Sequence, residues 1–176
     1  MQASELTVNT PMGTIMDCLP GAKRALFAAY HLGGCSSCAF SNEETLAELA
    51  TRSEVEPEAM LKQLLDSHEH DKQMLVESRE VHLDAWRMLD VRTREEYEAV
   101  HIDSAELMTQ ELQQKVFSED KEQRILLVDH QGKHVLDQVA WFRGHGLKQT
   151  FGLRGGIDAW SMEVDQSIQR YRLEMN

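Results

Sequence analysis

The chain lacks a long apolar run, a basic cluster and, near Met1, the residue pattern of a signal peptide, and each absence argues against a class of protein. No apolar run approaches the roughly 20 residues of a membrane-spanning helix, so we expect no membrane association. The N-terminus, MQASELTVNT, has neither the basic start nor the apolar core of a signal peptide, which predicts a cytoplasmic protein. Acidic residues outnumber basic ones by 30 to 18 without any Lys/Arg run, so we expect no nucleic-acid binding.

Cysteine is also scarce, with only Cys18, Cys35 and Cys38 in 176 residues. An odd, small number of cysteines without an export signal argues against a framework of structural disulfides. The thiols are therefore expected to react, to bind a metal or to be buried. Cys18 lies on an apolar helix face, where we expect it to act as a small hydrophobic side chain.

The first part of the chain predicts helices. Thr10 is expected to cap a helix that has Pro11 in its first turn, and Ser41 with Glu44 forms a capping-box pattern. The predicted helices run from Thr10 to about Cys18, Gly21 to His31, Asn42 to Thr51, and onward from Glu56. We assign residues 1–66 to a small all-helical domain and the polar residues 67–74 to a linker.

Residues 75–176 alternate short apolar strands with amphipathic helices. The strands are expected at Val81–Leu83, Met88–Val91, Ile125–Val128 and Thr150–Phe151. The helices are expected at Arg94–Val100, Thr109–Phe117, His134–His145 and Ile157–Val164. This alternation predicts an α/β fold in which helices flank a parallel sheet.

Three segments of the second half resemble a rhodanese domain. They are MLDVRTREEYEAVHIDSA (88–105), RILLVDHQGKHVLDQVAWFRGHG (124–146) and GLRGGIDAW (152–160). The resemblance covers about Val81 to Met162 and implies a rhodanese-like fold. It also implies that Asp90 and Arg92 organise the end of the sheet as exposed ion-pairing residues. Arg154 is expected on the same surface.

The resemblance also reveals a missing residue. Rhodaneses carry a sulfur-bearing cysteine where the central strand ends, and this chain has Asp129 there. The loop continues with His130, Gln131, Gly132, Lys133 and His134, in which Gly132 is retained and the two histidines replace basic residues. A carboxylate accepts the N–H hydrogen bonds of such a loop, but it cannot hold a persulfide. We therefore expect no thiosulfate sulfurtransferase activity from this loop.

Two minor interpretations of the loop stay open. Asp129, His130 and His134 carry donor atoms suited to a divalent metal. Asp129 alone has the chemistry of a nucleophile or general base. The alternative that we favour is a loop kept for binding or packing.

The first half resembles the small helical domain known as the hybrid-cluster-protein-associated redox disulfide domain. The resemblance rests on the Cys-x-x-Cys pair after Gly33-Gly34 and on the Glu-Thr-Leu-rich segment that follows, and it covers about Leu6 to Leu65. It implies that Cys35 and Cys38 form a dithiol/disulfide pair or ligate a cluster. No cofactor is assigned outright, and zinc or an iron–sulfur cluster at this pair remains an alternative.

Three functional hypotheses result. The first is a protein of thiol or sulfur metabolism in which Cys35 and Cys38 are a redox or sulfur-relay pair and the rhodanese-like domain is catalytically silent. The second is a regulatory or partner-binding module whose cysteines hold a metal or cluster. The third is a sulfurtransferase that uses Cys35 as sulfur acceptor, so whether the chain is an enzyme stays open. We expect a protein partner, and a homodimer that shares a cluster is a further alternative.

Overall fold

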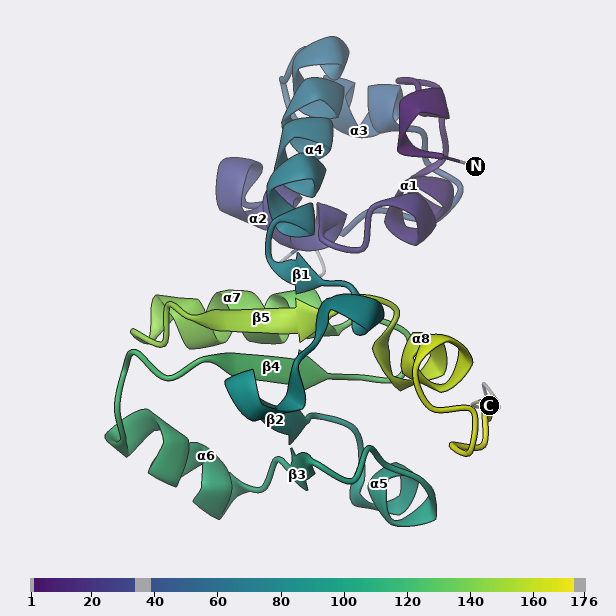
Figure 1. The fold of residues 1–176 in the computed structure, drawn as a ribbon. Coiled ribbons are helices and arrows are strands. Elements are labelled where there is room, and N and C mark those ends of the chain that lie inside the picture. Colours follow the sequence, from purple (N-terminus) through teal and green to yellow (C-terminus); the bar gives the residue numbers. More distant parts are fainter. Residues whose placement is uncertain (1, 34–38, 173–176) are drawn as a thin grey trace. The chain divides into compact units, whose positions relative to one another are not determined.

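The computed structural model describes residues 2–33 and 39–172 of the chain (Figure 1). The chain forms two compact units, Met1–Gln73 and Met74–Asn176. In the part of the chain that is described, no helix is both long and apolar enough to cross a membrane.

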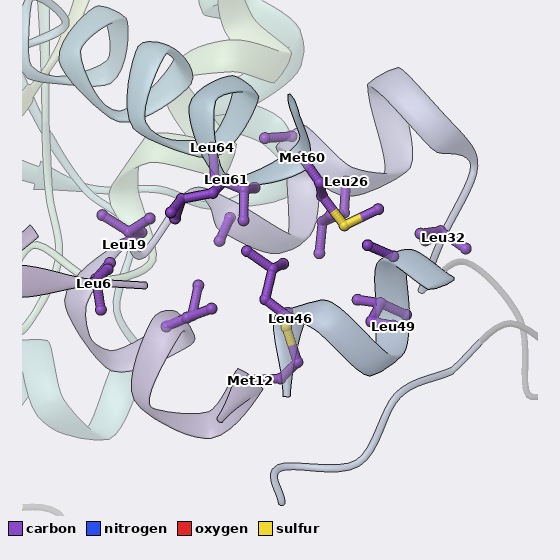
Figure 2. Packing of buried hydrophobic residues seen from close by; sticks show 14 residues of the cluster. Leu6, Met12, Leu19, Leu26, Leu32, Leu46, Leu49, Met60, Leu61 and Leu64 are labelled. Atoms are coloured by element: carbon purple, nitrogen blue, oxygen red, sulfur yellow. The ribbon is translucent and has the colours of Figure 1, made fainter. Parts of the chain in front are cut away.

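The first unit is helical, as the sequence predicts. Its helices are α1 (Met12–Cys18), α2 (Ala22–Tyr30), α3 (Leu46–Arg52) and α4 (Pro57–Lys72), preceded by the 3₁₀ turn η1 (Ala3–Glu5). All four α-helices contribute to one apolar core, which Figure 2 shows. Its most buried large side chains are Met12, Ile15, Leu19, Leu26, Leu46, Leu49, Met60 and Leu64.

Two expected helix starts were wrong. Pro11, not Thr10, is the N-cap of α1, and the Thr10 hydroxyl instead accepts a hydrogen bond from the backbone N–H of Thr7. The third helix begins four residues later than expected, at Leu46. Its capping box is made by Thr45 and Glu48, which exchange side-chain and backbone hydrogen bonds.

The capping-box pattern at Ser41 does not start a helix, because the backbone of residues 42–45 pairs with residues 11–13. Ser41 does accept a hydrogen bond from the Glu44 backbone N–H, but no helix starts there. The Glu44 carbonyl accepts instead from the Met12 N–H, and Thr45 forms an antiparallel bridge with Pro11. Hydrogen bonds with the start of α1, about 30 residues earlier in the chain, therefore override the local capping pattern.

The polar residues 67–72 are not a linker, because they form the last part of α4. They include Asp71, which is only 2% exposed and accepts a 2.7 Å hydrogen bond from Arg24 of α2. Gly21 allows this close approach, since a Cβ there would lie 2.0 Å from Asp71 Oδ2. This ion pair between two helices, in which the carboxylate is buried and the guanidinium partly exposed, gives the charged stretch a structural role.

The second unit is a five-stranded parallel sheet flanked by helices, which confirms the predicted fold class (Figure 1). The strand order is β1-β5-β4-β2-β3, and every neighbouring pair is parallel. The strands are β1 (Leu75–Val76), β2 (Arg87–Asp90), β3 (Ala105–Leu107), β4 (Ile125–Val128) and β5 (Thr150–Leu153). The helices are α5 (Arg94–Ala99), α6 (Gln110–Ser118), α7 (Val135–Gly144) and α8 (Gly156–Glu163).

The short strands at the edges of the sheet were predicted poorly. Residues 81–83 form no strand and lie at two 3₁₀ turns, η2 (Ser78–Glu80) and η3 (Leu83–Ala85). The edge strand is β1, and β3 on the opposite edge has only three residues. Strands of two or three residues carry too little alternation to be recognised, because pairing with a neighbour defines them.

The central strand β4 has apolar side chains on both faces of the sheet. Ile125 and Leu127 pack with side chains of α7, whereas Leu126 and Val128 pack with Ile157 of α8. This two-sided burial is typical of the middle strand of a parallel sheet. The carboxyl ends of β2 and β4 lie at one edge of the sheet, and this edge positions Asp90 and Asp129.

Candidate functional site

Asp129 follows the last residue of β4, and its carboxylate accepts three hydrogen bonds from the loop. Oδ1 accepts from the Gly132 N–H at 2.5 Å, and Oδ2 accepts from the N–H groups of His134 and Val135 at 2.9 and 3.0 Å. Asp129 is only 5% exposed. The expected interaction between the carboxylate and the loop amides is therefore present, at the N-terminus of α7 where a negative charge is favoured.

Glycines let the start of α8 pack closely on this loop. Gly132 has a φ of +76°, and a Cβ there would lie 2.5 Å from the Gly155 nitrogen. Gly156 has a φ of +60°, and its Cβ would lie 2.4 Å from the Asp129 carbonyl oxygen. That carbonyl accepts a 2.9 Å hydrogen bond from the Ile157 N–H. The GLRGG segment is thus needed to hold the shape of the Asp129 loop.

The two loop histidines have different environments. The His130 ring stacks on Tyr171, with ring centroids 4.2 Å apart and planes 15° from parallel. The side chain of His134 is exposed, as are those of Gln131 and Lys133. Within residues 2–33 and 39–172, no group of three His, Cys, Asp or Glu residues has the arrangement of a metal site.

Asp90 and Arg92 form a buried ion pair, not the exposed pair expected from the sequence. Arg92 donates to both carboxylate oxygens of Asp90, at 2.6 to 3.1 Å, and to the carbonyl of Val100 at 2.8 Å. The side chain of Arg92 is 2% exposed and that of Asp90 is 0% exposed. Burial opposes the charge of Arg92, but the hydrogen bonds to Asp90 and to Tyr171 raise its pKa. The pair fixes the chain between β2 and α5.

Tyr171 connects this ion pair to the Asp129 loop, and sequence analysis did not identify it. Its hydroxyl accepts from Arg92 Nη1 at 2.9 Å and donates to Glu96 Oε1 at 2.7 Å, while its ring stacks on His130. Burial, together with Glu96, raises the pKa of Tyr171 to about 12, although Arg92 opposes the shift. Burial alone would raise the pKa of Glu96, but hydrogen bonds from Tyr171 and Thr93 lower it.

Arg154 does not join the Asp90 pair. Its Nε lies 2.5 Å from Oε1 of Glu77, and both side chains are substantially exposed. On the α8 side of the loop, Asp158 accepts two hydrogen bonds from Arg170, at 2.6 and 2.9 Å. The hydrogen bonds from Arg170 lower the pKa of Asp158.

The cysteine pair belongs to the other unit. Cys35 and Cys38 lie outside the described residues, so the pair remains a prediction from the sequence. Cys18 lies at the end of α1 and packs, partly buried, against the apolar core.

Comparisons with known proteins agree with this fold. A family model for the rhodanese-like domain matches residues 61–163. No curated protein matches the chain.

Solved structures give three examples. A rhodanese-related protein from Thermoplasma volcanium is 21% identical, with 51% of this chain and 91% of that chain covered and a TM-score of 0.45. A Helicobacter pylori protein is 22% identical, with coverage of 57% and 98% and a TM-score of 0.46. A NAD-dependent persulfide reductase from A. fulgidus is 16% identical, with coverage of 67% and 23% and a TM-score of 0.41. Since the family model spans more than half of the 176 residues, the chain belongs to the rhodanese-like domain family.

Proposed function

We propose that this protein is a non-catalytic rhodanese-like protein of thiol or sulfur metabolism. In this proposal Asp129 occupies the position of the family's sulfur-bearing cysteine. The second unit then binds a protein partner, and Cys35 with Cys38 is the redox or sulfur-relay pair of the chain.

The observation that carries the proposal is the set of three backbone hydrogen bonds on the Asp129 carboxylate. The N–H groups of such a loop stabilise an anion, and in a sulfurtransferase that anion is a thiolate or a persulfide. In this chain a side chain of the loop itself supplies the negative charge. No sulfur atom is present to be loaded, and both carboxylate oxygens are already hydrogen-bonded.

A binding role fits the surface of the loop. Gln131, Lys133 and His134 expose their side chains, while the backbone under them is held by Asp129. A rigid backbone that presents polar side chains loses little conformational entropy when a partner binds. We therefore expect a polar protein surface as the partner of these three residues.

The first experiment measures sulfur transfer from thiosulfate to cyanide by the purified full-length protein. We expect no turnover above a buffer control for the wild type and for Asp129→Ala. The Asp129→Cys variant should instead acquire a thiol with a lowered pKa, detectable as a persulfide by mass spectrometry after incubation with thiosulfate. Wild-type turnover above the buffer control would contradict the proposal, whether or not it persists in Asp129→Ala.

The second experiment concerns the cysteine pair. Thiol titration before and after mild oxidation should show two fast-reacting thiols that disappear together and return with a reductant. Cys18→Ser should leave this result unchanged, and Cys35→Ser should abolish it. The alternative is that Cys35 and Cys38 hold a metal or a cluster. Metal analysis and an absorption spectrum of anaerobically purified protein test it, because bound zinc or an iron–sulfur cluster would contradict a redox pair.

A further inference from the structure

The chain after α8 turns back over one side of the Asp129 loop. We call residues 165–172 the C-terminal strap. Ile168 and Tyr171 of this strap pack, partly buried, against the apolar cluster that contains Ile157 and Trp160. The strap has no helix or strand of its own, and it is held by a backbone hydrogen bond from Asp165 to Trp160 of α8 and by contacts of its side chains.

Three polar attachments hold the strap. Arg170 donates two hydrogen bonds to Asp158 in the first turn of α8. Tyr171 stacks on His130, and the Tyr171 carbonyl lies 3.2 Å from Nε2 of that ring. The Tyr171 hydroxyl is hydrogen-bonded to Arg92 and to Glu96, as described above. The strap is thus joined to the loop, to α8 and to the Asp90–Arg92 pair at once.

The strap closes the His130 side of the loop. The small hollow lined by His130, Ile157 and Tyr171 has no volume for a water molecule. Outside this contact the packing is open: hollows of about 420 and 550 Å³ are lined in part by Tyr171, the first with Gln131 and the second with Glu96. A segment with few buried contacts and open space beside it is expected to open locally at a lower free energy than the whole unit.

We infer that the C-terminal strap is a latch, a segment that opens and closes to control access to the Asp129 loop. Contacts of Tyr171 with His130, Arg92 and Glu96 stabilise its closed state. This inference rests on the proposed function, because it assigns the regulation of the same binding loop. In the latched state a partner reaches Gln131, Lys133 and His134, but the His130 side is covered. A partner that binds the whole loop must displace Tyr171, and its affinity is reduced by the free energy of opening.

The test measures how fast diethyl pyrocarbonate modifies each histidine of the full-length protein, with the sites assigned by peptide mass spectrometry. His130 and His134 lie in the same loop, but only His130 contacts the strap, so His134 is an internal control. Tyr171→Ala should increase the modification rate of His130 about tenfold and leave that of His134 unchanged, because it removes hydrogen bonds to two charged groups from the closed state.

Two further variants refine the test. Tyr171→Phe keeps the stacked ring but loses the hydroxyl contacts, so its His130 rate should be intermediate. Gln166→Ala changes an exposed strap residue that lines none of these hollows and for which no side-chain hydrogen bond is found within the described residues, so it should behave as wild type. If Tyr171→Ala unfolds the second unit, as tryptophan fluorescence would show, Tyr171→Phe decides the question.

An unchanged His130 rate in a folded Tyr171 variant would overturn the latch. This result is independent of sulfur chemistry. If the wild type transfers sulfur while Tyr171→Ala still exposes His130, the proposed function fails and the latch remains. If the protein is inactive and the His130 rate does not change, the latch alone fails.

Discussion

Replacing Asp129 by alanine should strongly destabilise the second unit. The change removes the acceptor for three backbone N–H groups, those of Gly132, His134 and Val135. A hydrogen bond to a charged group contributes about 1.5–3 kcal/mol, so the simple sum is about 4.5–9 kcal/mol. That sum is an upper limit, because water can reach the loop at Gly132 and His134, whereas Val135 is fully buried. We expect the free energy of unfolding to fall by about 3–5 kcal/mol.

Urea unfolding followed by tryptophan fluorescence measures this loss. All three tryptophans (Trp86, Trp141 and Trp160) belong to the second unit, so their signal reports on it. Asp129→Asn should lose about half as much stability, because an amide oxygen still accepts on one side of the loop while its N–H₂ faces donors on the other. Asp103→Ala, an exposed acidic residue of the same unit, is the matched control and should change the stability by less than about 0.5 kcal/mol.

A small effect would refute the reasoning. If Asp129→Ala costs less than about 1 kcal/mol, the value of an exposed ion pair, the carboxylate does not hold the loop together. The same result would remove the observation on which the proposed function rests. An equal loss in Asp129→Ala and Asp129→Asn would show instead that the negative charge, and not the number of accepted hydrogen bonds, decides the stability.

Three other changes have defined outcomes. Gly132→Ala should lower the stability of the second unit by about 2–4 kcal/mol in the same fluorescence assay, because a side chain at φ +76° is strained and meets the Gly155 nitrogen; a neutral effect would contradict the close packing of α8. Gly21→Ala should cost the helical unit about 1–3 kcal/mol, measured by circular dichroism, because its Cβ would collide with Asp71; unchanged melting would show that this ion pair shifts freely. Tyr171 ionisation is read from the ultraviolet absorbance of wild type minus Tyr171→Phe. With a pKa raised to about 12, Tyr171 stabilises the fold fully below pH 10, and this contribution is lost as the pH rises through about 12. Only about a tenth of Tyr171 should be ionised at pH 11, and a midpoint near 10 would contradict its buried contacts.

The core of the second unit could be predicted because its sequence pattern is strong. Ile125–Val128 is four apolar residues bounded by charged ones, and the structure places β4 over the same residues. The α-helices of this unit begin and end within one residue of their expected positions, as α7 (Val135–Gly144) illustrates. Local periodicity carries this information because each helix buries one stripe against a sheet that buries both faces.

Contacts between distant segments decided what the sequence pattern missed. The true capping box at Thr45 differs from the expected one at Ser41 because residues 42–45 pair with the start of α1. Asp71 sits in a polar run that looks solvated, yet it is buried against Arg24. Such pairings depend on which helices meet, and no local pattern records that.

Residue types and chain neighbours alone predict the class of the fold, the position of Asp129 at the end of β4 and the glycines around its loop. The burial of Asp90 and Arg92, and the contacts that join Tyr171 to Arg92 and to His130, depend on the folded chain. The contacts of Tyr171 with Arg92 and His130 link residues that are more than 40 positions apart in the chain, and their energies arise only when burial removes water from both partners.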